Sequence, residues 1–174
     1  KKYITDKIGS EYVIPTLGIW DHPNEIEWES LPDQFVLKTT HGGGGNGVII
    51  CKDKSSLDKK KVEMQLQKSL DADLYKQFRE WPYKNVPRRI LAEVYMATNN
   101  NDYAEDLIDY KFFCFNGKPE YCQEIQNRSK LETIDFFDMS WEHMPFVGLN
   151  PNCSNSSIPV LRPSKFEEMN HVCR

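Results

Sequence analysis

The chain has 174 residues, of which 39% are hydrophobic and 28% are charged, so it can form a core and is expected to be soluble. Its formal net charge of -4 argues against nucleic acid as the main partner, and no apolar run is long enough to cross a membrane. The five cysteines are odd in number and lack Cys-x-x-Cys spacing, which favours free thiols in a reducing cytoplasm over disulfides or zinc.

Hydrophobic periodicity and turn residues divide the chain into short strands and helices. The expected strands are residues 12–20, 35–37, 48–50, 88–96, 107–115 and 118–125. The expected helices are residues 1–10, residues 54–70, a short helix that Asp71 begins, and a last helix that starts near Lys165.

The clearest helical pattern is that of residues 54–70, where three apolar residues recur at four-residue spacing on one face. Ser55 or Ser56 is expected to cap the start of this helix. Later in the chain, Asn116-Gly117 separates the last two expected strands, and this dipeptide is the strongest short signal for a β-hairpin. We expect the hairpin to lie in the larger sheet of the fold.

A glycine-rich segment connects the expected strands 35–37 and 48–50. Five glycines occupy six positions there: Gly42, Gly43, Gly44, Gly45 and Gly47. Glycine lets the backbone approach a ligand closely, and successive backbone N–H groups can line a concavity that holds an anion. Lys38 ends the first strand shortly before this segment. A fixed cation beside backbone donors predicts a site for a polyphosphate.

Several known types of glycine-rich loop are possible interpretations of this segment. Gly42, Gly44 and Gly47 satisfy the dinucleotide motif G-x-G-x-x-G, but that motif needs a helix next, and a strand-like sequence follows here. A P-loop needs Gly-Lys-Ser or Gly-Lys-Thr, which is absent. In protein kinases the lysine follows the loop, and the His-Arg-Asp and Asp-Phe-Gly elements are missing here. A lysine that ends one strand before a glycine flap and a second strand resembles the ATP-grasp arrangement instead.

Four stretches extend this likeness: Leu31–Lys38, His41–Gly43, Ala92–Glu93 and Asp109–Lys118. Together they resemble the TupA-like ATP-grasp family, whose members occur in bacterial gene clusters for cell-surface polysaccharide and teichuronopeptide synthesis. The resemblance covers nearly the whole chain. It implies an α+β ATP-grasp fold in which two subdomains with antiparallel sheets flank a nucleotide cleft.

The resemblance also implies a domain organisation. Residues 1–174 form a single ATP-grasp-like domain, with an N-terminal part over about 1–85 that carries the glycine flap and a partial C-terminal subdomain over about 86–174. ATP-grasp proteins bind magnesium through residues on late strands. We therefore expect the metal ligands to lie beyond Arg174. Among the candidate site residues of this chain, none is assigned as a metal ligand.

The family pattern assigns candidate nucleotide-binding residues by position. It places Lys38 and the segment from Gly42 to Gly47 against the phosphates, with His41 as a further candidate contact. The backbone of a linker strand is implied to meet the adenine: Glu93, Val94, Tyr95 and Met96. Lys111 falls where the family repeats a lysine in the nucleotide cleft. From the residues alone, a cross-strand ion pair for Lys111, an edge-strand charge for Glu93 and a structural role for His41 stay open.

By this resemblance the protein is an ATP-dependent carboxylate ligase that forms an acyl phosphate and passes it to an amine or thiol, in bacterial cell-surface polysaccharide biosynthesis. The expected cofactors are ATP and Mg²⁺, and the expected substrate is a small-molecule or sugar-linked carboxylate. A glycosyltransferase that uses a nucleotide sugar, and a nucleotide-binding module without catalysis, stay open. Asp71-Ala72-Asp73 fits the Asp-x-Asp motif of glycosyltransferases formally, and Glu124 with Asn127 could reach a metal.

Overall fold

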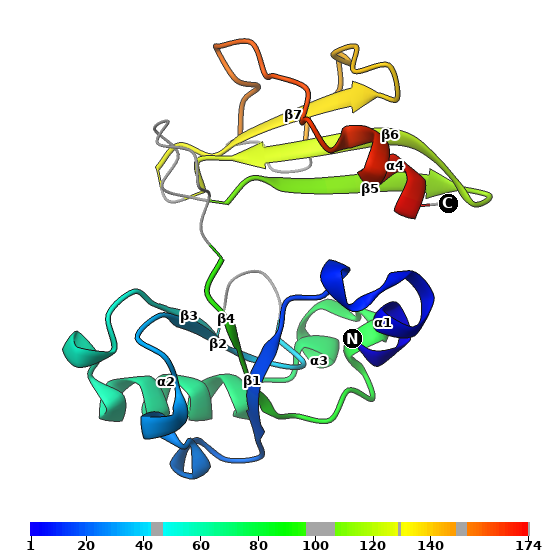
Figure 1. Ribbon diagram of the computed structural model, residues 1–174. Coiled ribbons are helices and arrows are strands. Elements are labelled where there is room, and N and C mark those ends of the chain that lie inside the picture. The colour runs from blue at the N-terminus through cyan, green and yellow to red at the C-terminus, as the bar shows by residue number, and fades with distance from the viewer. Residues whose placement is uncertain (43–46, 97–106, 129, 149–152, 174) are drawn as a thin grey trace. The chain divides into compact units, whose positions relative to one another are not determined.

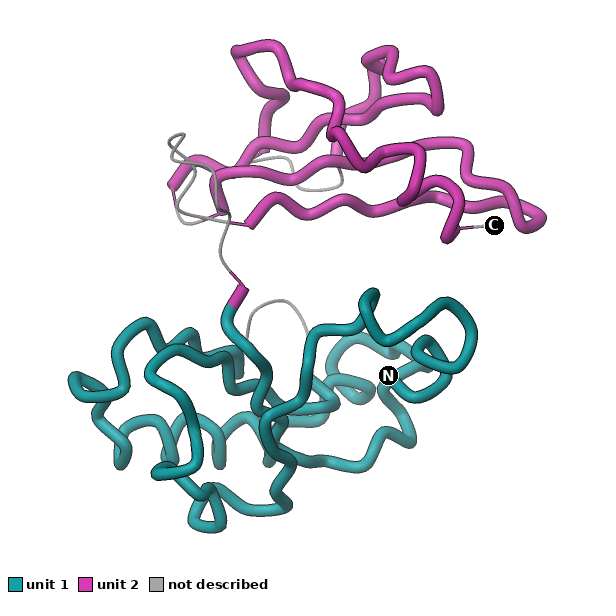
Figure 2. Tube along the Cα trace, viewed as in Figure 1, with its two compact units in different colours: residues 1–95 teal, residues 96–174 magenta. Residues whose placement is uncertain are grey.

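A computed structural model of the chain describes residues 1–42, 47–96, 107–128, 130–148 and 153–173. The chain divides into two compact units, residues 1–95 and residues 96–174 (Figure 2). Each unit has an antiparallel sheet of its own and at least one helix among its described residues, which confirms the expected α+β class (Figure 1). Within the ranges given above, no helix is both long and apolar enough to span a bilayer.

The first unit is built on a sheet with the strand order β1-β4-β2-β3, in which all neighbours are antiparallel. The strands are β1 (Thr16–Trp20), β2 (Phe35–Thr39), β3 (Val48–Cys51) and β4 (Ile90–Val94). The helices are α1 (Lys2–Ile8), α2 (Lys59–Asp71) and α3 (Leu74–Phe78). Short 3-10 turns lie between them: Ser10–Tyr12, Pro23–Glu25, Trp28–Ser30, Lys54–Ser56 and Trp81–Tyr83.

The core of the first unit lies between α2 and one face of this sheet (Figure 1). Alternate residues of β2, Phe35 and Leu37, are fully buried, because successive strand residues point to opposite faces. The apolar stripe of α2 that the four-residue spacing predicted is buried against them: Val62, Leu66 and Leu70. On the opposite face of the sheet Ile19 and Ile50 are exposed, whereas Glu93 is buried.

The start of α2 differs from the expectation. Asp58 caps the helix, because its Oδ1 accepts a hydrogen bond from the Lys61 backbone N–H at 3.0 Å. Ser55 instead belongs to a separate 3-10 turn, where its backbone N–H donates to Asp53 Oδ1 at 2.8 Å. Leu57, between this turn and α2, has an extended backbone, so the helix predicted over residues 54–70 is interrupted there. Two aspartates act as caps in succession: Asp53 caps the 3-10 turn, and Asp58 caps α2.

The second unit has a smaller sheet with the order β5-β6-β7. Its elements are β5 (Asp109–Phe115), β6 (Lys118–Gln126), β7 (Thr133–Asp138) and α4 (Phe166–Val172). The predicted hairpin is confirmed: Asn116 and Gly117 form its turn with φ angles of 50° and 75°, which suit this dipeptide. Its expected place in the larger sheet was wrong, because β5 and β6 pair with β7 and not with the four strands of the first unit.

The first unit extends ten residues beyond the expected subdomain limit near residue 85, to Tyr95. The reason is that β4 pairs with both β1 and β2 and so lies inside the first sheet. Strand β7 is an element that the sequence did not predict. It pairs with β6 from Thr133 to Asp138, and it makes β6 the central strand of the second sheet.

Candidate functional site

Lys38 and Glu93, which the sequence assigned separately, form an ion pair on the first sheet. In the register of β2 and β4, Val36 lies opposite Glu93 and Lys38 lies opposite Leu91, so the two charged residues are diagonal neighbours on one face. Lys38 Nζ lies 2.5 Å from Glu93 Oε2. The alternative of an edge-strand charge for Glu93 was wrong, because β4 is bordered on both sides by strands.

Lys1 also contacts Glu93, and no pattern in the sequence predicts this contact. Its Nζ lies 2.6 Å from Glu93 Oε1. It further donates to the Ile14 carbonyl at 2.5 Å and to Thr16 Oγ1 at 3.0 Å. Thr16 lies opposite Glu93 in the pairing of β1 with β4, so this contact depends on strand register. We call Lys1, Lys38 and Glu93 the lysine–glutamate cluster.

The electrostatics of the lysine–glutamate cluster favour an anion. Glu93 is only 5% exposed, and burial opposes its ionisation, but the hydrogen bonds and charges of Lys1 and Lys38 outweigh burial and lower the pKa of Glu93. Two ammonium groups and one carboxylate then leave a net charge of +1 at neutral pH. The Lys38 side chain is 37% exposed, so a ligand can reach part of it.

His41 and the ends of the glycine segment have structural partners. His41 is buried at the end of β2, and its Nε2 lies 3.1 Å from the Ala72 carbonyl, which supports the structural alternative for this residue. Gly42 donates its N–H to the Thr39 carbonyl at 3.3 Å. At Gly47, φ is +78°, and a Cβ would lie 2.7 Å from Ser69 Oγ, so both backbone angle and packing require glycine there. Gly43, Gly44 and Gly45 lie outside the described residues.

A hollow of about 790 Å³ lies beside the part of β4 that was expected to meet the adenine. Its lining residues are Pro32, Asp33, Gln34, Lys52, Asp53, Val94 and Tyr95. Val94 pairs with Phe35, whereas Lys38 pairs with Leu91, so the hollow and Lys38 are offset by three residues along β2, or about 10 Å. Met96, the last residue of the expected linker strand, is exposed.

Lys111 belongs to the second unit, on the face of its sheet opposite to the one that carries the buried Cys122 and Glu124 of β6. It is exposed, and its cross-strand neighbour is Gln123 and not an acid, so the register does not support the ion-pair alternative. It borders a cavity of about 620 Å³. Most of the other lining residues are apolar or aromatic, among them Phe113, Phe115, Tyr121, Phe136 and Phe146.

Glu124, a candidate metal contact from the sequence, lies on the opposite, buried face of this sheet. It is 2% exposed and sits between Tyr110 of β5 and Asp135 of β7 in the strand register. Burial, and then the nearby charge of Asp135, raise the pKa of Glu124, although Gln126 donates a hydrogen bond to it. Glu124 Oε2 has no hydrogen-bond partner among the described residues. Within that part of the chain no group of His, Cys, Asp and Glu could hold a metal, so the metal hypothesis for Glu124 finds no support.

The Asp-x-Asp motif at residues 71–73 is engaged in local structure. Asp71 Oδ1 accepts a hydrogen bond from Gln67 Nε2 at 3.0 Å. Asp73, and not Asp71 as expected, caps α3 through the Lys76 N–H at 3.0 Å, and it also forms an ion pair with Arg88 at 3.1 Å. These partners give both acids a structural role at the junction of α2 and α3.

Lys38 is thus a partly exposed lysine in a group of net positive charge, near the end of a strand and shortly before a glycine-rich segment. This is an arrangement suited to binding a phosphate group. The chain matches the family described as TupA-like ATPgrasp over residues 1–170, and it therefore belongs to the TupA-like ATP-grasp family. Membership confirms the resemblance and suggests an ATP-dependent, ligase-like function. Comparison with curated proteins and with solved structures gave no match.

Proposed function

We propose that the protein is an ATP-dependent carboxylate ligase in bacterial cell-surface polysaccharide biosynthesis. The observation that carries the proposal is the lysine–glutamate cluster, whose Lys38 lies near the end of β2 and shortly before the glycine segment, in a chain of the ATP-grasp family. Its net positive charge and the partly exposed side chain of Lys38 fit a polyphosphate.

In this proposal the nucleotide lies along β2 and β4. Lys38 and backbone N–H groups of the glycine segment bind the phosphates, and the backbone of residues 93–96 binds the adenine beside the hollow at Val94 and Tyr95. The offset of about 10 Å between Val94 and Lys38 supports this direction, because base and phosphates are separated by the ribose. The family assignment of Lys111, which belongs to the second unit, to nucleotide binding stays a prediction.

The proposed reaction has two steps. Transfer of the γ-phosphoryl group of ATP to a carboxylate oxygen yields an acyl phosphate and ADP. An amine or thiol then attacks the acyl carbon, loses a proton and releases inorganic phosphate. Mg²⁺ would reduce the charge of the phosphates, but none of the residues that the structure describes forms a group fit to hold it, so no step is assigned to a metal ligand.

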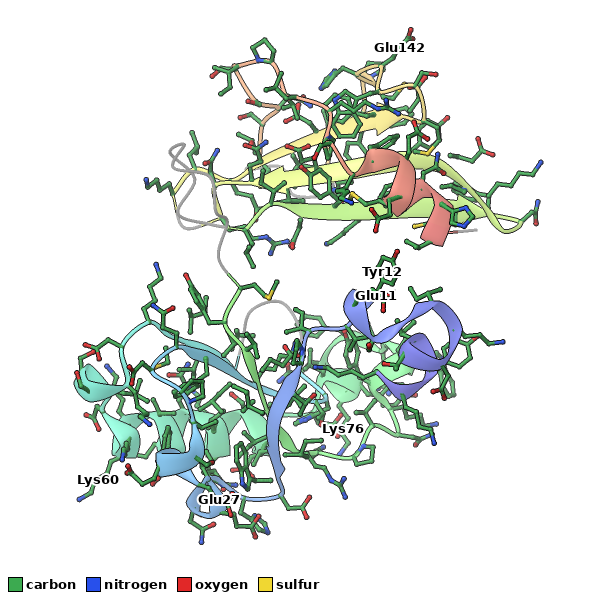
Figure 3. The ribbon with its side chains drawn as sticks, viewed as in Figure 1. Glu11, Tyr12, Glu27, Lys60, Lys76 and Glu142 are labelled. Atoms are coloured by element: carbon green, nitrogen blue, oxygen red, sulfur yellow. The ribbon has the colours of Figure 1, made fainter. Side chains whose placement is uncertain are left out.

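The substitution Lys38→Ala tests the proposal. Charge-assisted hydrogen bonds are worth about 1.5–3 kcal/mol, so ATP should bind roughly 10- to 100-fold more weakly to the variant. Adenosine, which has no phosphate, should bind almost equally to both proteins. Lys60→Ala is the matched control, because Lys60 lies on the outer side of α2 (Figure 3).

Calorimetric titration of the three proteins with ATP and with adenosine provides the measurement. Unchanged ATP affinity in folded Lys38→Ala would remove the main support for phosphate binding at this strand. A thermal-shift comparison of adenine and uridine nucleotides separates the ligase from a glycosyltransferase, since a nucleotide-sugar enzyme should be protected by the uridine nucleotide.

A further inference from the structure

Lys1 differs from Lys38 in how its ammonium is used. An ammonium has three N–H donors, and those of Lys1 are matched by three acceptors: Glu93 Oε1, the Ile14 carbonyl and Thr16 Oγ1. Such a group is fixed in place and has no donor left for a ligand. For Lys38 the described residues offer one acceptor, Glu93 Oε2, so two donors remain available.

Glu93 divides its two carboxylate oxygens between these lysines. Because the carboxylate is almost fully buried, water cannot readily replace a partner that leaves. A buried carboxylate that loses its only cation is strongly destabilised. If Lys38 turns from Glu93 to a phosphate, Glu93 therefore needs a second cation that stays behind.

We propose that Lys1 is a positioning residue of the nucleotide site, which keeps Glu93 paired while Lys38 turns to the phosphates. This inference rests on the proposed function and deepens it. Lys1 does not touch the nucleotide; it lowers the cost of moving the Lys38 ammonium from the carboxylate to the ligand. Glu93 in turn holds Lys38 ready at the end of β2 when no nucleotide is bound.

A double-mutant cycle tests this coupling on the full chain, with ATP in magnesium-containing buffer as the probe. Lys1→Met keeps the length of the side chain but removes its charge, and it should weaken ATP binding about tenfold. Glu93→Gln removes the carboxylate, so neither Lys1 nor Lys38 has its ion pair with residue 93 in this variant. In the Glu93→Gln background, Lys1→Met should therefore have almost no effect on ATP affinity.

The cycle separates this role from a structural one. Lys1 also ties the start of α1 to Ile14 and Thr16, and those bonds persist in Glu93→Gln. A merely structural Lys1 would weaken binding equally in both backgrounds, which would overturn the inference. Lys2→Met, an exposed neighbour in α1, is the matched control, and adenosine affinity should stay the same in every variant.

The outcomes also distinguish this inference from the proposed function. If the wild-type protein shows no ATP binding by calorimetry, the proposed function fails and this inference fails with it. If the wild type binds ATP and Lys1→Met binds it equally well, only the role of Lys1 is overturned. Circular dichroism of each variant verifies that the fold is retained before the affinities are compared.

Discussion

The two units each bury a glutamate on the central strand region of a sheet, and they treat its charge in opposite ways. Glu93 on β4 lies between two lysines, and its pKa is lowered despite burial. Glu124 on β6 is buried to a similar degree, but its neighbours in register are Tyr110 and Asp135, and its pKa is raised. Burial alone therefore does not decide the state of a carboxylate; the residues opposite it in the strand register do.

The difference separates a ligand site from a structural interior. Lys1 and Lys38, which stabilise the Glu93 carboxylate, have partly exposed side chains, so the net positive charge there is not fully buried. On the buried face around Glu124, Asp135 is satisfied by His143 at 2.9 Å and by the Ser156 N–H at 3.0 Å. Nearby aromatic rings cover that face, with Phe137 and Trp141 stacked at 4.1 Å.

The largest expected effect comes from leaving Glu93 without any cation. The double variant Lys1→Met/Lys38→Met should lower the free energy of unfolding of the first unit by about 3 kcal/mol at pH 7, the lower end of the range for a broken buried pair, because the lysines are partly exposed. Urea unfolding with hydrogen exchange of β4 measures it. Lys60→Met/Lys68→Met is the control, and an equal loss in both variants would contradict the pairing.

An intermediate effect is an opposite response of the two units to pH. The lowered pKa of Glu93 contributes stability that is present above its ordinary value of 4.5 and is lost as the pH falls through its folded value. The raised pKa of Glu124 contributes stability that is present below 4.5 and is lost as the pH rises through its folded value.

Substitution by glutamine should show this contrast directly. At pH 7, Glu93→Gln should destabilise the first unit, whereas Glu124→Gln should stabilise the second unit by about 1–3 kcal/mol, because it removes a buried ionisable group that has no cation beside it and one oxygen without a partner among the described residues. Near pH 4 both effects should shrink. Hydrogen exchange of β4 and β6 amides at the two pH values measures the two units separately, and effects of the same sign would contradict the comparison.

The smallest expected effect concerns the helices that cover the sheets. Asp58→Ala removes the cap of α2 and should lower the free energy of unfolding by about 1 kcal/mol, whereas Asp58→Asn keeps an acceptor oxygen and should cost little. The N-cap residue of α4, Lys165, makes no side-chain capping hydrogen bond, so Lys165→Ala should not produce a capping loss. Thermal unfolding of the three variants is the measurement, and an equal loss in Asp58→Asn would show that the cap hydrogen bond is not the cause.

The sequence by itself determined the local elements and the family. The spacing of Val62, Leu66 and Leu70 predicted the buried stripe of α2, and Asn116-Gly117 predicted the β5–β6 hairpin. These signals are local, because helix periodicity and turn angles depend on residues a few positions apart. The position of Lys38 before the glycine segment and the Asp109–Lys118 stretch likewise indicated the ATP-grasp family, which the match over residues 1–170 confirms.

Tertiary structure alone decided which residues surround each charge. Lys1 meets Glu93 across more than ninety positions of sequence, because β1 pairs with β4 so that Thr16 lies opposite Glu93. Glu124 is buried beside Asp135 because β7, which the sequence did not predict, pairs with β6 in that register. Strand register fixes which side chains become neighbours, and a shift of one residue would turn them to the other face of the sheet. No local pattern in the chain carries that information.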